Sequence, residues 1–347
     1  MDRDALLAAF RLQAGGCRLF DSPLYASLCE RAEDDIRAGG PMARLLAHWE
    51  GDPLHAFLPL RVLGAVHERV LNGEAPELAR HFPTVGGHAD ADAAWPAFLA
   101  VLDEQREALL PRLENYPQTN EVRRCAGLLG LFLHVARRSG LPLRLREIGC
   151  SAGLNLQWAE YGYQLGPHRW GAADAPVQIA AEWSGSAADF DSPVSIESRA
   201  GCDLDPRRIE SDADVRTLEA FIWADQPERL GQLRAAIALA RHDPPRIEQE
   251  SAFPWLQREL AEPADGVCRV VYHSAFWLYL EPQEQDAIRA LFAEHAARAT
   301  EGTPFAWVRH ENGENIAEIE LRVSLWPGGD ETFAGMGHPH GRRITWF

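Results

Sequence analysis

The stretch Leu143-Arg144-Leu145-Arg146-Glu147-Ile148-Gly149-Cys150-Ser151-Ala152-Gly153-Leu154-Asn155 is the most informative part of this 347-residue chain. Its first six residues read as a strand, and the glycines that follow allow a tight turn into a helix beginning near Leu154. The start of such a helix is expected to offer unpaired backbone N–H groups to a ligand. Glu147, two positions before Gly149, suits a cationic amino group better than a pyrophosphate. We predict a ligand-binding turn here; the alternative is a plain tight turn.

Strands and helices alternate on both sides of this turn. Further strands are expected at 177–182, 246–250, 268–273 and 305–310, and helices at 121–138 and 282–298. Such alternation predicts a parallel sheet with helical crossovers. Residues 318–325 alternate strictly between polar and apolar, which predicts a half-buried antiparallel strand, and another strand pair is expected around residues 338–341. The fold class is therefore α/β, with a Rossmann-like sheet that begins parallel and ends in an antiparallel hairpin.

Two other regions accompany this sheet. Residues 1–115 carry apolar residues at helical spacing and no chemical motif, so we expect a helical N-terminal region before a Rossmann-like domain at 116–347. Residues 184–245 separate the expected second and third strands by more than an ordinary crossover. We interpret this segment as an inserted lid over the site.

Composition excludes several functions. The formal net charge is −17, and an acidic surface repels a phosphate backbone, so no nucleic-acid partner is expected. The chain contains no lysine, which rules out Schiff-base chemistry and a phosphate-loop lysine. No apolar run reaches the roughly 18–20 residues that span a bilayer, and the start Met1-Asp2-Arg3-Asp4 is unlike a secretory signal. We expect a cytoplasmic protein with a small-molecule substrate and no membrane partner.

Candidate cofactor-binding residues lie in the turn and at the expected strand ends, where ligands of open α/β sheets bind. Within the turn they are Ser151, Gly153 and Asn155, beside the residues already named. Glu182 ends the second expected strand and is expected to accept hydrogen bonds from both hydroxyls of a ribose. Ser251, after the third expected strand, is expected near an adenine edge. The alternative for Glu182 and Ser251 is a solvated or structural strand end.

Candidate catalytic residues follow the fourth and fifth expected strands. They are His273, His310 and Glu311. Histidine titrates near neutrality and can take a proton from an acceptor nucleophile, although each of these histidines taken alone fits a structural role better. His338 and His340 are two positions apart, but their Pro and Gly neighbours indicate a turn. We therefore expect no metal site.

Candidate substrate-binding residues are Gln118 and Asn120, in the polar turn before the helix at 121–138, and Asp203. That helix leads into the first strand, so its start is expected near the mouth of the pocket. Side-chain amides both donate and accept hydrogen bonds, and suit a carboxylate, an amide or a hydroxyl. The alternative is helix capping by Thr119 or Asn120.

Several motifs resemble those of a bacterial family grouped as domain of unknown function 2332. They are Pro117-Gln118-Thr119-Asn120-Glu121, the glycine turn, Gly201-Cys202-Asp203-Leu204-Asp205-Pro206, Trp223-Ala224-Asp225-Gln226 and His338-Pro339-His340-Gly341. The resemblance covers nearly the whole chain. The family name implies no activity.

More distantly, the glycine turn and the antiparallel ending resemble class I S-adenosylmethionine-dependent methyltransferases. This resemblance implies a cofactor held by Glu147, Gly149, Gly153 and Glu182, and methyl transfer to a small molecule. Ser151 stands where a glycine is commoner, and residues 273–276 lack the Asn/Asp-Pro-Pro-Tyr motif of methyltransferases that act on nucleic-acid amino groups. The alternatives are a non-catalytic S-adenosylmethionine or nucleotide binder and a nicotinamide oxidoreductase. The antiparallel ending and the missing second glycine count against the oxidoreductase.

Overall fold

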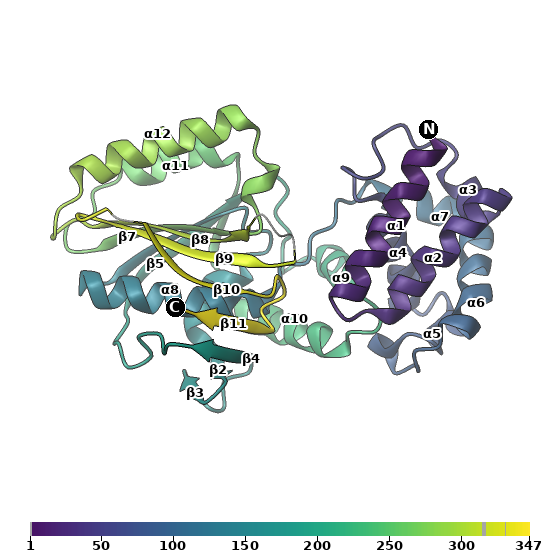
Figure 1. Ribbon diagram of the computed structural model, residues 1–347, viewed down its shortest axis with the longest axis horizontal. Coiled ribbons are helices and arrows are strands. Elements are labelled where there is room, and N and C mark those ends of the chain that lie inside the picture. The colour runs from purple at the N-terminus through teal and green to yellow at the C-terminus, as the bar shows by residue number, and fades with distance from the viewer. Residues whose placement is uncertain (1, 314–316, 330) are drawn as a thin grey trace. The chain divides into compact units, whose positions relative to one another are not determined.

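The computed structural model describes residues 2–313, 317–329 and 331–347 (Figure 1). The chain forms two compact units: Met1–Thr119 with Glu210–Leu233, and Asn120–Ile209 with Arg234–Phe347. Residue 119 is therefore the last of the first N-terminal segment, where the sequence suggested residue 115. The middle of the segment expected as a lid belongs to the first unit.

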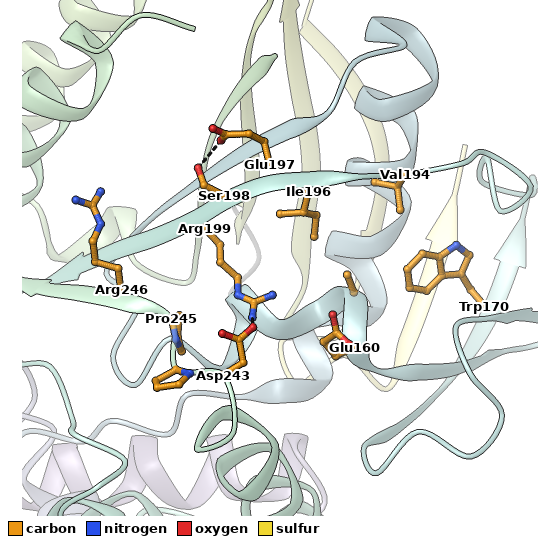
Figure 2. Close-up of a pocket in the computed structure, with 12 residues that line it drawn as sticks. Glu160, Trp170, Val194, Ile196, Glu197, Ser198, Arg199, Asp243, Pro245 and Arg246 are labelled. Carbon is orange, nitrogen blue, oxygen red and sulfur yellow. Dashed lines mark hydrogen bonds and ion pairs between the residues drawn. The ribbon is translucent and has the colours of Figure 1, made fainter. Parts of the chain in front are cut away.

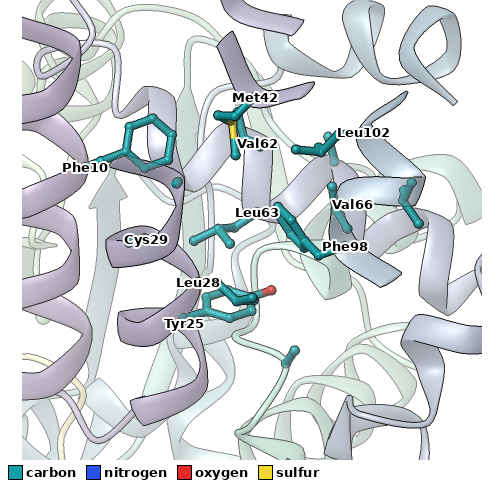
Figure 3. Close-up of a cluster of buried hydrophobic side chains, with 14 of the residues drawn as sticks. Phe10, Tyr25, Leu28, Cys29, Met42, Val62, Leu63, Val66, Phe98 and Leu102 are labelled. Carbon is teal, nitrogen blue, oxygen red and sulfur yellow. The ribbon is translucent and has the colours of Figure 1, made fainter. Parts of the chain in front are cut away.

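The first unit is helical, as its apolar spacing predicts. Apolar residues from its helices form one core, in which Tyr25, Val62 and Phe98 are buried (Figure 3). Trp223, from the later segment, belongs to this core and lies against Tyr25, with ring centroids 6.3 Å apart. The helices are α1 (Arg3–Leu19), α2 (Pro23–Ala38), α3 (Pro41–Leu46), α4 (Leu58–Leu71), α5 (Pro76–Ala79), η1 (Pro83–Val85), α6 (Ala91–Glu104), α7 (Arg106–Leu109), η2 (Leu110–Glu114) and α9 (Asp212–Ala220).

The second unit is built on an 11-stranded sheet, counted over the described residues, in the order β3-β2-β4-β11-β10-β9-β8-β7-β1-β5-β6. From β6 to β8 the strands are parallel, and from β8 to β11 each pair is antiparallel. β11, β4 and β2 run parallel, and β3 closes that edge antiparallel to β2. The strands are β1 (Leu143–Ile148), β2 (Gly162–Leu165), β3 (His168–Trp170), β4 (Gln178–Gly185), β5 (Ile196–Asp203), β6 (Arg246–Gln249), β7 (Cys268–Ser274), β8 (Phe305–Asn312), β9 (Ile319–Trp326), β10 (Glu331–Gly337) and β11 (Arg343–Trp346).

Helices cover both faces of this sheet (Figure 1). α8 (Cys125–Ser139) packs on one face, where Phe132 meets Tyr272 of β7. α11 (Ala252–Ala261) and α12 (Pro282–Arg298) cover the other face, around Val271 and Phe305. Because side chains alternate along a strand, those of β7 and β8 fall into two sets, one facing α8 and the other facing α11 and α12. Three short 3-10 helices and one α-helix complete the described elements: η3 (Val122–Arg124), η4 (Leu154–Glu160), η5 (Trp277–Tyr279) and α10 (Pro227–Ala240).

The mixed α/β class is confirmed, with a sheet that is parallel around β1 and continues into antiparallel strands. The strands expected at 246–250, 268–273, 305–310 and 318–325 are β6, β7, β8 and β9, and the helix expected at 282–298 is α12. The helix expected at 121–138 is η3 followed by α8, and it ends at Gly140 in the left-handed region, with φ +63°.

One strand assignment is wrong. The strand expected at 177–182 is β4, and it does not lie in the parallel part of the sheet around β1. The strand that follows β1 in that part is β5, which pairs with β1 from Leu143 to Ile148. β5 lies inside the segment 184–245 that was interpreted as a lid, so this segment contributes a central strand of the sheet. Its sequence, Ile196-Glu197-Ser198-Arg199-Ala200-Gly201-Cys202-Asp203, has no apolar run in its first half. The reason is that β6 begins only opposite Ala200, which leaves that half partly exposed.

Candidate functional site

The parallel part of the sheet reverses its strand order next to β1. Along the chain β1 comes first, β5 second, β6 third, β7 fourth and β8 fifth, and in space they lie in the order β6-β5-β1-β7-β8. Successive strands therefore depart from β1 in opposite directions, and the reversal falls between β1 and β7. Ligands of open α/β sheets bind at such a point, beyond the carboxyl ends of the strands. The glycine turn follows β1 and lies at this position.

The first N–H groups of the turn are hydrogen-bonded to neighbouring chain. The N–H groups of Gly149 and Cys150 both donate to the carbonyl of Cys202 at the end of β5, at 2.9 and 3.1 Å. The N–H of Ser151 donates to Oδ2 of Asp203 at 2.8 Å. Asp203 therefore fixes the turn, and its carboxylate lies at the carboxyl end of β5.

The remaining N–H groups of the turn are bound as well. Oδ1 of Asn120 accepts from the N–H groups of Ala152 and Leu154, both at 3.1 Å, and the N–H of Gly153 donates to Cys150 O at 2.8 Å. The expectation of unpaired N–H groups is wrong, because side chains from two other segments fill them. The helix after the turn is the 3-10 helix η4.

Asn120 acts as a cap, although of a different segment from the one expected. It caps the glycine turn, whereas Glu121 caps η3 by accepting from the N–H of Arg123. Asn120 is 8% exposed and has φ +34°, a conformation that asparagine tolerates better than most residues. Gln118 belongs to the helical unit. The structure therefore brings Asn120 and Asp203 to the turn as supports.

Glu147 is a buried acid directly beneath the turn. Its side chain is 1% exposed, and Tyr272 donates a hydrogen bond from its hydroxyl to Oε2 of Glu147 at 3.1 Å. Burial raises the pKa of Glu147 to about 8, while the Tyr272 hydrogen bond and the nearby positive charge of Arg124 oppose that increase. Arg124 also donates to the carbonyl of Ser274, at the end of β7. The end of β1 thus combines a proton-holding carboxyl group with a guanidinium.

Neither glycine of the turn has room for a side chain. Gly149 has φ +68°, and a Cβ there would collide with the ring of Phe276, which follows β7. Gly153 has φ +67°, and a Cβ there would lie 2.6 Å from Ile247 of β6. Ser151 and Ala275 also have positive φ, at 54° and 49°. Backbone strain of this kind often accompanies functional sites.

His273 is fully hydrogen-bonded. Trp307 donates from its indole N–H to Nε2 of His273 at 3.0 Å, so Nε2 is an acceptor and the ring proton is on Nδ1. That N–H donates to Oε1 of Glu311. Glu311 also accepts from the backbone N–H groups of Phe276 and Trp277, at 3.0 and 3.3 Å. Glu311 therefore holds the loop after β7, and both ring nitrogens of His273 are engaged in hydrogen bonds.

His310 is as buried as His273 but lies on the α8 face of the sheet. Within the part of the chain that the structure describes, neither of its ring nitrogens has a hydrogen-bond partner. Burial, with a smaller contribution from the positive charge of Arg124, lowers its pKa to about 3. Its ring packs against Gly127, whose absent side chain leaves room for it. His310 is a neutral core group.

The other predicted residues lie at different distances from the turn in the sheet. Asn155 is 1% exposed, and its Oδ1 accepts from the thiol of Cys125 at 3.4 Å. Ser251 is the N-cap residue of α11, beyond β6, on the same edge as the turn. Glu182 lies on β4, which β11, β10, β9, β8 and β7 separate from β1. The structure therefore does not bring Glu182 to the turn. The prediction that placed it there is wrong because the strand that lies beside β1 is β5 and not β4.

A pocket of about 730 Å³ lies elsewhere in the second unit, where β6 leaves the first half of β5 uncovered (Figure 2). Trp170, Ile196, Arg199 and Asp243 are among its lining residues, and none of the residues predicted from sequence is. Arg199 and Asp243 point toward one another and form an ion pair. Of the other charged lining residues, Glu197 pairs with Arg144 and Arg246 pairs with Glu259, neither of which lines the pocket.

Over residues 2–313, 317–329 and 331–347, no group of three or more His, Cys, Asp or Glu side chains could hold a metal ion. No helix in the same ranges is long and apolar enough to cross a membrane.

The fold is therefore that of a mixed α/β protein with a large, mostly parallel sheet, in which the strand order reverses beside a glycine turn. The chain belongs to a family described as an uncharacterized protein conserved in bacteria (DUF2332), whose model matches residues 7–346. The resemblance expected from the sequence motifs is thereby confirmed. Among curated proteins, no match to the chain is found.

Proposed function

We propose that this protein binds S-adenosylmethionine at the carboxyl ends of β1 and β7 and transfers its methyl group to a small molecule. The strand order around β1 supports a ligand site at this point of the sheet. The cofactor supplies an electrophilic methyl group on a positively charged sulfur, so the protein's task is to bind and orient the reactants.

Two features together carry the proposal. The backbone N–H groups of the turn are already hydrogen-bonded, and carboxyl groups lie at the carboxyl ends of the neighbouring strands. Phosphates bind where backbone N–H groups are free, and the N–H groups of this turn are occupied by Asn120, Asp203 and strand carbonyls. Carboxyl groups of Glu147, Asp203 and Glu250 lie at the ends of β1, β5 and β6. Such an edge disfavours NAD and ATP and favours a cation without phosphate. S-adenosylmethionine fits that description.

The residues have distinct roles in this proposal. Glu147 binds the positive charge of the cofactor, and Arg124, beside Ser274, binds its carboxylate. Asn120 and Asp203 position the turn. We assign no catalytic role to His273 and Glu311 in this proposal, because His273 is bound by Trp307 and Glu311, and Glu311 holds the loop after β7. Methyl transfer in this site would release the acceptor's proton to water.

A second candidate function is a non-catalytic binder of the same cofactor. The lack of a hydrogen-bond-free, accessible base among His273, His310 and Glu311 favours it. Turnover distinguishes the two functions, because a binder would retain affinity without consuming cofactor in the presence of acceptor candidates.

Calorimetry and thermal shift with S-adenosylhomocysteine, NAD and ATP test the proposal. S-adenosylhomocysteine at about 100 times its dissociation constant should stabilise the fold by about 2.7 kcal/mol, and NAD and ATP should not. Because burial raises the pKa of Glu147 to about 8, binding of the ligand's ammonium should release a proton, and affinity should increase up to about 10-fold per pH unit below pH 8. No heat and no melting shift with S-adenosylhomocysteine would reject the proposal.

Variants sharpen this test. Gly149→Val is unsuitable, because φ +68° and the contact with Phe276 would destabilise the fold itself. Glu147→Gln keeps the shape and removes the charge, so affinity should fall by at least about 10-fold, the loss expected when a hydrogen bond to a charged group is removed. Glu294→Gln, on the exposed side of α12, is the control and should bind like the parent.

A further inference from the structure

We propose that the ring of Phe276 occupies part of the cofactor site in the ligand-free protein and moves aside when the site is filled. The inference rests on the proposed function. A Cβ on Gly149 would collide with the ring of Phe276, so the ring lies directly against the turn. It does so between the ends of β1 and β7, where the strand order reverses. A ligand approaching the Gly149 backbone therefore meets Phe276 first.

A carboxylate holds the start of the loop that carries this ring, and Gln285 holds its end by donating to the carbonyls of Trp277 and Leu280, both at 3.1 Å. Glu311 accepts from the N–H groups of Phe276 and Trp277, and its orientation is fixed by Nδ1 of His273. Trp277 stacks on His273 with ring centroids 4.9 Å apart. Glu311 is therefore a positioning residue: it holds the loop in the arrangement that places Phe276 on the turn.

The same loop has the features of a segment that can move. Phe276 is half-buried, and the residues after it, Leu278 and Tyr279, are 55% and 50% exposed. Ala275, immediately before the ring, has φ +49°, which strains an alanine and is relieved when the backbone rotates. Phe276 packs against the buried cluster around Val271 and Phe305 but is itself only half-buried, so moving it on this strained hinge exposes less apolar surface than moving a fully buried ring.

Binding to Phe276→Ala tests the displacement. If the open arrangement is a minor population, removal of the ring should tighten S-adenosylhomocysteine binding by about 10-fold. The melting temperature should fall by no more than about 4 °C, because the ring is only half-buried. Leu278→Ala, on the exposed side of the same loop, is the matched control and should change neither quantity.

Hydrogen exchange tests the carboxylate clamp without any ligand. The N–H groups of Phe276 and Trp277 should be protected in the parent and exchange at least about 10-fold faster in Glu311→Ala. Glu311→Gln, which retains an acceptor oxygen, should lie between the two and covers the case in which the alanine variant does not fold.

Three outcomes overturn the inference. Weaker or unchanged binding by Phe276→Ala shows that the ring does not obstruct the ligand. A fall in melting temperature well beyond about 4 °C identifies a core residue. Unprotected N–H groups in the parent remove the clamp. If neither protein binds S-adenosylhomocysteine, the proposed function fails, and the melting and exchange results alone decide between a displaceable ring and a fixed one.

Discussion

The two ends of the sheet are held together by different chemistry. Around β1, β5 and β7, buried polar groups bind one another: Asn120 and Asp203 fix the turn, and Tyr272 meets Glu147. We call β11, β4, β2 and β3 the aromatic half, because rings supply its packing. There Trp183 stacks on Trp346 with ring centroids 5.5 Å apart. Hydrogen bonds fix atoms in direction as well as distance, so the polar region is the part of the sheet suited to hold a ligand.

The largest effect on stability is expected in the aromatic half. Trp346 is 6% exposed, stacks on Trp183, and fills the space above Gly130, whose Cβ would lie 2.6 Å from the ring. Trp346→Ala should lower the free energy of unfolding by about 3–5 kcal/mol, measured by urea denaturation. Affinity for S-adenosylhomocysteine should remain unchanged. Phe347→Ala, at a position 58% exposed, is the control and should change stability by about 0.5 kcal/mol or less.

The next effect lies in the polar region and depends on pH. Because burial raises the pKa of Glu147 to about 8, the folded state holds a proton that the unfolded state loses above its ordinary value near 4.5. Stability from this group is therefore complete below pH 4.5 and is lost as pH rises to 8. Glu147→Gln keeps a neutral side chain, so at pH 9 it should be more stable than the parent by a few kcal/mol, at about 1.4 kcal/mol per pKa unit. Equal stability of parent and variant at pH 5 and pH 9 would contradict this environment for Glu147.

A smaller loss is expected at Asn120. Asn120→Ala leaves the N–H groups of Ala152 and Leu154 without their acceptor, which should lower the free energy of unfolding by about 1–3 kcal/mol. Unlike Trp346→Ala, it should also weaken ligand binding, because the turn is no longer fixed. Asn120→Asp retains the acceptor oxygen and should preserve most of both properties. Loss of stability with normal affinity would show that the polar region does not serve binding.

The smallest effect is expected at His310. Replacing this buried, unpartnered ring by leucine should change stability by less than about 1 kcal/mol at pH 7, because no hydrogen bond is lost. Its pKa is lowered to about 3, so the parent loses stability as pH falls from 6.5 toward 3, and His310→Leu should have a flatter profile there. Acid titration of the unfolding free energy measures this. A large loss of turnover, once an acceptor is known, would instead restore His310 as a base.

The parts of this fold that could be predicted from sequence are those with a strong periodic signal. α12 and the strands β1, β7 and β8 are bounded by glycine or proline and carry continuous or alternating apolar residues. β5 has no such signal, since half of it lacks a neighbour on one side. This omission shifted the expected ribose contact to Glu182, which lies on a strand at the other side of the sheet.

The place of the glycine turn at the end of a strand could be predicted from sequence, whereas its hydrogen bonds could not. The glycine turn at the end of β1 follows from the motif itself. That Asn120 and Asp203 fill its N–H groups depends on contacts between residues more than 30 positions apart, at |i−j| of 32, 34 and 52, which no local pattern reveals. The same holds for His273 and Glu311, because only the pairing of β7 with β8 and the placement of Trp307 show that both are already bound.

The helical unit is discontinuous in sequence, and this has a consequence for synthesis on the ribosome. Trp223 and Asp225 come from the later segment Glu210–Leu233. Trp223 belongs to the core of the unit, and Asp225 accepts hydrogen bonds from the Ser22 hydroxyl and from the N–H of Leu24, the latter at 3.0 Å. At about 5–20 residues per second, the N-terminal helices wait on the order of 5–20 seconds before this segment emerges. During that interval Tyr25 and its neighbours lack Trp223. A nascent chain paused before residue 210 is thus the form of this protein most exposed to chaperones and to aggregation.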